Sequence, residues 1–180
     1  MLDQRRDALR PALTAMQIIV AALAMGVISF GVVVVTALVK PDQLQPNAGL
    51  LTNLAAVGTL IAIGLSFVLP KVIVNQARRK IAKGLWRSVP QATPAGQALA
   101  ALGDEGQLVM VYQTALIVAV ALVEGGAFFA LIATMIDKSS LALALAGLCL
   151  FFILLRFPTL GRLENWLEVQ RKALKEDRMF

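Results

Sequence analysis

The hydrophobic residues of this chain are gathered into four long runs, at residues 13–39, 50–74, 108–136 and 141–157. A helix needs about 20 apolar residues to cross a hydrocarbon core roughly 30 Å thick, so the first three runs are long enough to span a membrane. The fourth is close to the lower limit of about 17 residues, and we expect it to cross nearly upright or to continue past Pro158. The pattern predicts an all-α membrane protein, in which residues 1–180 form a single domain with a bundle of four transmembrane helices.

The basic residues divide sharply between the segments that connect these runs. Most lie in the N-terminal segment, in the loop at residues 75–107 and in the C-terminal segment at residues 159–180, whereas the two short connectors hold only Lys40 and Lys138. By the positive-inside rule, both termini and the long loop are expected in the cytoplasm, in a multi-pass protein of the cell (inner or plasma) membrane. Arg156, near the cytoplasmic end of the fourth run, is expected to extend its side chain toward the lipid headgroups.

Two cytoplasmic segments, after the second and fourth runs, repeat apolar residues at helical spacing opposite a basic face. The second and fourth runs each end near a proline, Pro70 and Pro158, and beyond these lie the stripes Val74, Ala77, Ile81, Leu85 and Leu160, Leu163, Trp166, Leu167, Leu174. Each predicts an amphipathic helix. It lies in the headgroup layer with Trp86 or Trp166 as an interfacial anchor, packs against a partner's helix, or simply extends the preceding helix into solvent. Between them, residues 88–106 predict a loop with one short helical turn at residues 97–102.

The composition excludes several classes of function. The chain is 58% hydrophobic with a mean hydropathy of +0.76, and it contains no histidine and a single cysteine, Cys149. A His/Cys metal site, an intrachain disulfide and a His-assisted nucleophile cannot be built from these residues. We find no nucleotide-binding glycine loop and no paired-carboxylate site, and we predict no enzyme, no metal and no cofactor. The net charge of +6 is placed to meet anionic lipid headgroups rather than nucleic acid.

A similarity within the chain relates the first run to the third. Residues 21–34 align without gaps on residues 120–133, matching Gly26 to Gly125 and Phe30 to Phe129. Apolar helices resemble one another through composition alone, so internal duplication and chance similarity are both open. In a duplication, Met25 occupies the place of Glu124.

Glu124 is the most informative residue, because it lies in the middle of an apolar run. It is about 15 residues from either end of that run, which places it close to the bilayer midplane. An ionised, unpaired carboxylate there costs at least a few kcal/mol, so we expect the neutral acid. One interpretation is that Glu124 binds a proton or a small cation. The other is a permanently protonated acid that hydrogen-bonds to a hydroxyl of a neighbouring helix, with candidates at Ser29, Thr59 and Ser66.

Small residues mark where helices can approach closely in lipid. Gly125 and Gly126 with Ala121 provide such a surface beside Glu124, and Gly26 provides one on the first run. Packing within the chain and oligomerisation both explain this pattern. Cys149 is expected to contribute to packing rather than to redox chemistry.

The segment around Glu124 resembles a known family. Residues 113–136 read QTALIVAVALVEGGAFFALIATMI and are similar to the outer helix of the c subunit, the proteolipid that forms the rotor ring of ATP synthases. In that family the ion-binding carboxylate stands in a context similar to A-L-x-E-x-x-x-F-x-A-L. The resemblance implies that Glu124 takes the position of the proton-carrying acid.

The rest of the chain departs from the c subunit, which is a two-helix hairpin, or a fused pair of hairpins, with a glycine-packed inner helix. The second run here has only Gly58 and Gly64 in its interior, and a long loop containing VPQATP replaces the family's short polar loop. The resemblance therefore implies at most a divergent relative.

Two functions are compatible with these observations. The first is a small four-helix membrane protein with a structural or partner-binding role, its partners being the lipid bilayer and either other membrane proteins or further copies of itself. The second is proton or cation handling through Glu124. We favour the first, because a transporter usually needs more than one intramembrane polar group along its path.

Overall fold

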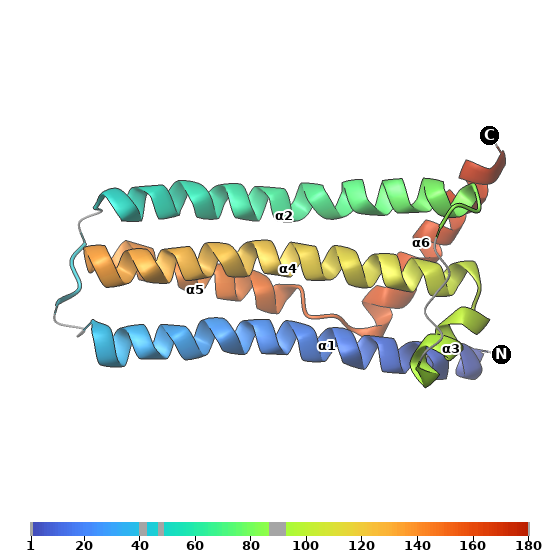
Figure 1. Ribbon diagram of the computed structural model, residues 1–180, viewed down its shortest axis with the longest axis horizontal. Helices are drawn as coiled ribbons and strands as arrows, with labels where there is room; N and C mark the ends of the chain where they lie inside the picture. The colour runs from blue at the N-terminus through green and yellow to red at the C-terminus, as the bar shows by residue number, and fades with distance from the viewer. Residues whose placement is uncertain (1, 40–42, 47–48, 87–92, 180) are drawn as a thin grey trace. The chain divides into compact units, whose positions relative to one another are not determined.

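The computed structural model describes residues 2–39, 43–46, 49–86 and 93–179, and this part of the chain is all-α (Figure 1). The long helices are α1 (Leu2–Val33), which continues as the π-helix η1 (Val34–Leu38), α2 (Leu50–Ala82) and α4 (Asp104–Asp137). The shorter helices are α3 (Pro94–Ala101), α5 (Ser140–Leu155) and α6 (Leu160–Met179). The described residues contain no strand, only one isolated β-bridge between Gln45 and Ser139. The prediction of an all-α protein is confirmed.

Helices α1, α2 and α4 are each long and apolar enough to cross a membrane. The fourth predicted run corresponds to α5, which has only 16 residues and meets this criterion only together with α6. Pro158 lies in the break between α5 and α6, where its ring and its missing N–H prevent one helix from continuing into the next. The described chain therefore has three helices of membrane-spanning length, or four if the broken pair is counted as one crossing.

Helix α2 differs from the prediction at Pro70. It passes through this proline without a break and ends at Ala82, so the apolar run and the amphipathic segment after it form one helix. A proline inside a helix removes one hydrogen bond, and helices of membrane proteins tolerate this where neighbouring groups replace it. The turn after α2 contains Gly84 at φ +68°, a conformation that favours glycine.

The short turn predicted at residues 97–102 is part of a helix that begins earlier, at Pro94. The Thr93 side chain accepts a hydrogen bond from the Gly96 N–H at 3.1 Å, and a proline in the first turn loses nothing because its N–H would be unpaired there. Residues 88–92 of the predicted loop lie outside the described residues, as does Lys40.

Residues from segments 1–18, 69–117 and 158–180 form one compact unit with a hydrophobic core. Fully buried side chains from three helices meet there, namely Leu9, Met16, Leu108, Leu163 and Leu167. Among the described residues, ion pairs between segments of this unit join Arg78 to Asp177 (2.6 Å), Arg178 to Asp104 (2.7 Å), Arg6 to Glu164 (3.0 Å) and Arg171 to Glu105 (3.4 Å). This unit is organised like a water-soluble domain, with an apolar interior and a charged exterior.

Most residues of the two amphipathic stripes are buried inside this unit, although Leu85 is 72% exposed. Val74, Ala77 and Ile81 of α2 belong to the same buried cluster as Leu163, Leu167 and Leu174 of α6. Trp86 and Trp166 pack half-buried against that cluster, and the Trp166 ring lies 5.0 Å from the Tyr112 ring between centroids. Burial within the chain therefore accounts for most of these apolar residues, and contact of the remainder with lipid or with a partner's helix stays a prediction.

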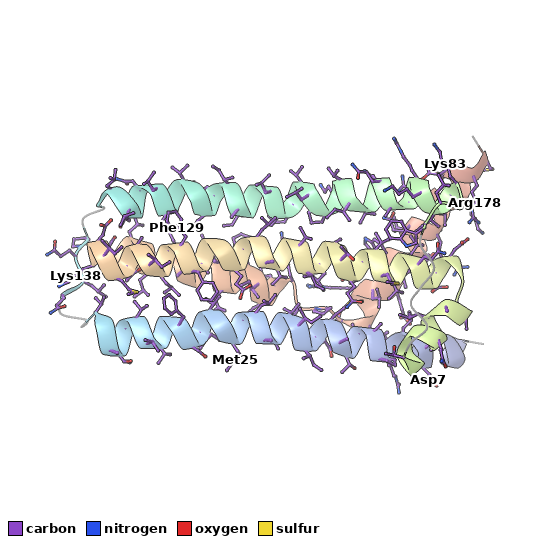
Figure 2. The ribbon with its side chains drawn as sticks, viewed as in Figure 1. Asp7, Met25, Lys83, Phe129, Lys138 and Arg178 are labelled. Carbon is purple, nitrogen blue, oxygen red and sulfur yellow. The ribbon has the colours of Figure 1, made fainter. Side chains whose placement is uncertain are left out.

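Residues 19–68 and 118–157 contribute parts of α1, α2, α4 and α5 to a second compact unit. Helix α4 runs between α1 and α2 in Figure 1, and Phe129 points from it toward α2 (Figure 2). Unlike the first unit, this one exposes many large apolar side chains, among them Val57, Leu60, Ile61, Phe151 and Leu154. An apolar exterior of this kind is stable against lipid and costly in water.

The burial of α6 generates a stability prediction. Leu167→Ala should lower the free energy of unfolding by about 2–4 kcal/mol, because it leaves a cavity at a fully buried position. Thermal denaturation of the detergent-solubilised protein and protease sensitivity of residues 158–180 measure the effect. Val169→Ala is the matched control, since that side chain is 62% exposed on the same helix. If the two variants lose the same stability, the packing of α6 described above is incorrect.

Candidate functional site

Glu124 lies on the side of α4 that faces α1, within the second unit. Its side chain is half-buried, and a Cβ atom added at Gly26 would lie 3.6 Å from its Oε1 atom and 3.8 Å from Cζ of Phe128. The rings of Phe128 and Phe30 meet 5.6 Å apart next to this contact. Gly26 therefore leaves room for the carboxyl group at the junction of α1 and α4, where a larger residue would narrow the space.

The hydroxyl groups predicted as partners of Glu124 lie elsewhere. Ser29 is exposed on α1, the buried Thr59 donates to the carbonyl of Gly126 at 3.4 Å, and Ser66 donates to the carbonyl of Ile63. Among the described residues, no hydrogen bond or ion pair involves the Glu124 carboxyl group. The carboxyl group of Glu124 therefore lacks a partner among the described residues, and the side chain is partly exposed.

The small residues around Glu124 fall into two groups. Gly126 is buried where three helices meet, since a Cβ there would contact Ala62 at 3.5 Å and the Sγ atom of Cys149 at 3.7 Å. Ala121 and Gly125 are exposed, and no atom lies within 4 Å of a Cβ added at Gly125. Gly126 thus serves contacts within the chain, while Ala121 and Gly125 form a shallow exposed surface one turn or less from Glu124.

The relation between the first and third runs has a geometric counterpart. Gly26 lies beside Glu124 and Gly31 beside Leu131, so α1 and α4 run in the same direction with similar positions at the same level. Met25, which the alignment places opposite Glu124, is 57% exposed on the outside of α1 (Figure 2). The two aligned positions therefore have different surroundings.

Arg156 is the residue whose role sequence reasoning missed. It caps the C-terminus of α5 and donates from Nη1 to the carbonyl of Ala119 (3.1 Å) and from Nη2 to Oγ of Ser66 (2.9 Å). Its Cζ atom lies 4.6 Å from the centroid of the Phe67 ring, a cation–π contact. The side chain joins α5 to α2 and α4 rather than simply extending outward, and no local sequence pattern marks such a contact between distant helices.

Asp137, the last residue of α4, joins this helix to the first turn of α2. Its Oδ2 atom accepts hydrogen bonds from the backbone N–H (2.7 Å) and the hydroxyl (2.9 Å) of Thr52, in the first turn of α2. Gly49 is required beside it, because a Cβ there would overlap the Asp137 carboxylate. Backbone bonds between Gln45 and residues 138 and 140 strengthen the same end. These contacts are structural.

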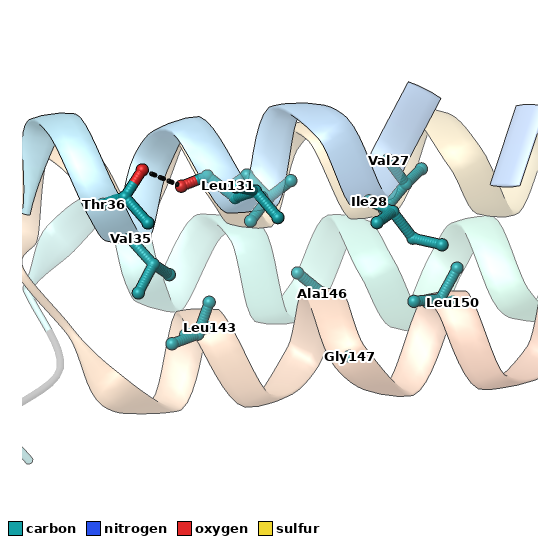
Figure 3. Close-up of a pocket in the computed structure, with 11 residues that line it drawn as sticks. Val27, Ile28, Val35, Thr36, Leu131, Leu143, Ala146, Gly147 and Leu150 are labelled. Carbon is teal, nitrogen blue, oxygen red and sulfur yellow. Dashed lines mark hydrogen bonds between the residues drawn. The ribbon is translucent and has the colours of Figure 1, made fainter. Parts of the chain in front are cut away.

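A groove of about 460 Å³ runs between α1 and α5 over Leu131 of α4 (Figure 3). Its walls are aliphatic except for Thr36, whose hydroxyl donates to the carbonyl of Val32 at 2.7 Å. The groove therefore offers volume without a polar group to orient a ligand. It uses a different side of α1 from Gly26, so Glu124 is not part of it.

The Asp137 contact predicts a graded response to substitution. Asp137→Ala should lower the free energy of unfolding by about 1–3 kcal/mol, because it leaves the buried Thr52 hydroxyl and a helix N-terminal N–H without an acceptor. Asp137→Asn keeps one acceptor oxygen and should lose less. Thermal denaturation in detergent compares them, and equal losses in the two variants would show that the acceptor is unimportant.

Among the described residues, no group of three or more Asp, Glu or Cys side chains is arranged to hold a metal ion. The candidate site is therefore the carboxyl of Glu124 with the exposed small residues next to it. Comparison with known proteins adds no assignment to this geometry: no family model matches the chain, and neither a curated protein nor a solved structure matches it significantly.

Proposed function

We propose that this chain is a structural, partner-binding protein of the cell membrane that crosses the bilayer four times and associates with a second copy of itself through Glu124. The observation that carries the proposal is the carboxyl group of Glu124, half-buried beside Gly26 and without a hydrogen-bond partner in the described part of the chain.

The distribution of charge supports this topology. Of the 17 Lys and Arg residues, all except Lys40, Lys138 and Arg156 fall in segments 1–18, 69–117 and 158–180, which form the unit with the water-soluble type of core. Positive charge concentrates on the cytoplasmic side of membrane proteins, so we assign the charged parts of these segments to the cytoplasm and the second unit to the bilayer. In this arrangement α5 is the fourth crossing.

In this topology the position of Glu124 along α4 keeps its carboxyl group within the bilayer. Glu124 lies about 20 Å along the helix from Asp137, the last residue of α4. It remains in hydrocarbon, where the neutral acid is favoured and an unsatisfied polar group costs several kcal/mol.

A second copy of the chain supplies the hydrogen-bond partner that Glu124 lacks in the described part of its own chain. All copies insert with the same orientation, so a twofold axis along the membrane normal brings two Glu124 side chains to the same depth. A neutral carboxylic acid both donates and accepts, and two of them therefore satisfy each other. The exposed Ala121 and Gly125 allow the helices to approach closely at this level.

Ion handling is the second candidate, and one observation favours it. The carboxyl group is not enclosed by hydroxyls and is partly accessible from one side of α4, as a reversible proton-binding group requires. The resemblance of residues 113–136 to the outer helix of the rotor-ring c subunit implies the same use of Glu124 in a divergent relative. We prefer self-association, because ion transport needs further polar groups along a path through the membrane, whereas dimer formation does not.

The topology predicts which cysteines are accessible from outside. In a Cys149→Ala background, a cysteine at the exposed Gln43 should react with an impermeant maleimide added to intact cells, because the short connectors face outward. Cysteines at the exposed Lys83 and Lys175 should react only after the membrane is permeabilised. The opposite pattern would reverse the orientation.

Glu124 substitutions test self-association. With a single cysteine at Gly125, the purified, reconstituted protein should form bismaleimide cross-linked dimers, whereas a cysteine at Val57, exposed on α2, should not. Glu124→Leu should weaken dimer formation by roughly threefold or more, the equivalent of about 0.6 kcal/mol or more for interhelical hydrogen bonding. Glu124→Gln retains a donor and an acceptor and should preserve it. Equal cross-linking in the Leu and Gln variants would exclude a hydrogen bond at the interface.

Proton flux separates the two candidate functions. Under a pH gradient, vesicles containing the wild-type protein should be no leakier to protons than vesicles containing Glu124→Gln, if Glu124 serves association alone. Gln cannot ionise, so a flux that is present in the wild type and lost in a normally folded, cross-linking Glu124→Gln variant would establish ion handling instead.

A further inference from the structure

Among the described residues, the cation of Arg156 has hydrogen-bond partners but no counterion. Its two side-chain hydrogen bonds go to neutral acceptors, the carbonyl of Ala119 and the hydroxyl of Ser66. No Asp or Glu side chain pairs with it in the described part of the chain. The ion pairs found there join residues of the first unit, formed by segments 1–18, 69–117 and 158–180. A guanidinium carries five N–H donors, so these two bonds leave donors available.

The surroundings of Arg156 are apolar and open on one side. Its Cζ atom lies over the ring of Phe67, which is 50% exposed, and the Phe152 ring meets Phe67 edge-on at 6.4 Å. Phe151, 56% exposed, packs against Phe152. The contact with the ring face leaves the planar edge of the guanidinium to donate, and the aromatic side chains next to it form a surface suited to hydrocarbon.

The position of Arg156 along α5 sets its depth, if the proposed topology is correct. The 16 residues of α5 rise about 24 Å from the outer end, against a hydrocarbon core of roughly 30 Å. Arg156 is therefore a few ångströms inside the cytoplasmic boundary, close to the phosphate groups of that leaflet. The C-terminal dipole of α5 compensates only part of its charge.

We propose that Arg156 binds the phosphodiester group of an anionic phospholipid in the cytoplasmic leaflet, with an acyl chain of that lipid lying on Phe67 and Phe151. A guanidinium edge matches two phosphate oxygens, and these charge-assisted hydrogen bonds are stronger than bonds to neutral acceptors. An anionic lipid supplies the full negative charge that the site lacks. A phosphatidylcholine headgroup supplies it only together with its own cation.

The test measures lipid binding to the full chain. Delipidated protein in detergent is titrated with phosphatidylglycerol or phosphatidylcholine, and bound lipids are counted by native mass spectrometry. The wild type should bind one phosphatidylglycerol more tightly than phosphatidylcholine. Arg156→Gln should weaken the tight binding on the order of tenfold, as expected for loss of a charge-assisted hydrogen bond. Lys172→Gln is the control, because that side chain is 74% exposed and forms its ion pair with the nearby Glu168.

Three results would overturn the proposal. Equal affinity of the wild type for the two lipids, or an unchanged preference in Arg156→Gln, would show that Arg156 does not select the phosphate. Displacement of the tight lipid by inorganic phosphate would assign the site to a soluble anion. A purely structural role predicts lower thermal stability of Arg156→Gln in both lipids, with the preference for phosphatidylglycerol unchanged.

A measurement on the unaltered chain keeps the proposal testable if Arg156→Gln does not fold. A phosphatidylglycerol with a photoreactive acyl chain should cross-link to peptides that contain Phe67 or Phe151, and excess phosphatidylglycerol should compete while phosphatidylcholine should not. Cross-links confined to other helices would place the lipid elsewhere. This outcome is independent of dimer formation at Glu124, which lies on the side of α4 facing α1, so failure of one proposal leaves the other intact.

Discussion

Polar groups in the apolar helices must find their partners within the protein, because hydrocarbon offers none. Several hydroxyls do so through local hydrogen bonds: those of Thr36 and Thr134 donate to the carbonyl four residues earlier, and that of Ser66 to the carbonyl three residues earlier. Such bonds bend a helix slightly but leave no donor unused. Glu124 makes no such bond. A carboxyl group cannot be satisfied by its own backbone in this way, and this one has no other partner in the described residues, which is why the proposed function depends on it.

The two units place their large apolar side chains in opposite ways. The unit that contains the termini turns its leucines inward and surrounds them with ion pairs such as Arg78–Asp177. The other unit leaves large side chains such as Leu60 and Phe151 on its exterior and places small residues, Gly58 and Gly126, at the contacts between helices. In water, the hydrophobic effect stabilises the first arrangement. In lipid this effect does not drive helices together, so their association depends on close packing.

Glu124 and Arg156, two ionisable side chains of the second unit, reduce the cost of a charge in apolar surroundings in different ways. Arg156 spreads its charge over a carbonyl, a hydroxyl and an aromatic ring, and we propose a lipid phosphate as its further partner. Glu124 lies deeper along its helix and can remove its charge by binding a proton. The sequence resemblance of its helix to the outer helix of the rotor-ring c subunit covers residues 113–136 and centres on this acid.

The sequence by itself determined the all-α class, the three long apolar helices and the concentration of charge in the terminal and middle segments, since these depend on hydrophobicity and length along a single helix. It also singled out Glu124, because an acid in an apolar run is conspicuous without any knowledge of its neighbours. Only the tertiary structure decided what the apolar stripes of α2 and α6 face, where the hydroxyls near Glu124 donate, and that Arg156 turns toward Ser66 and Ala119. Periodicity tells which side of a helix is apolar but not what covers it, and a contact between residues far apart in the chain depends on how the helices pack.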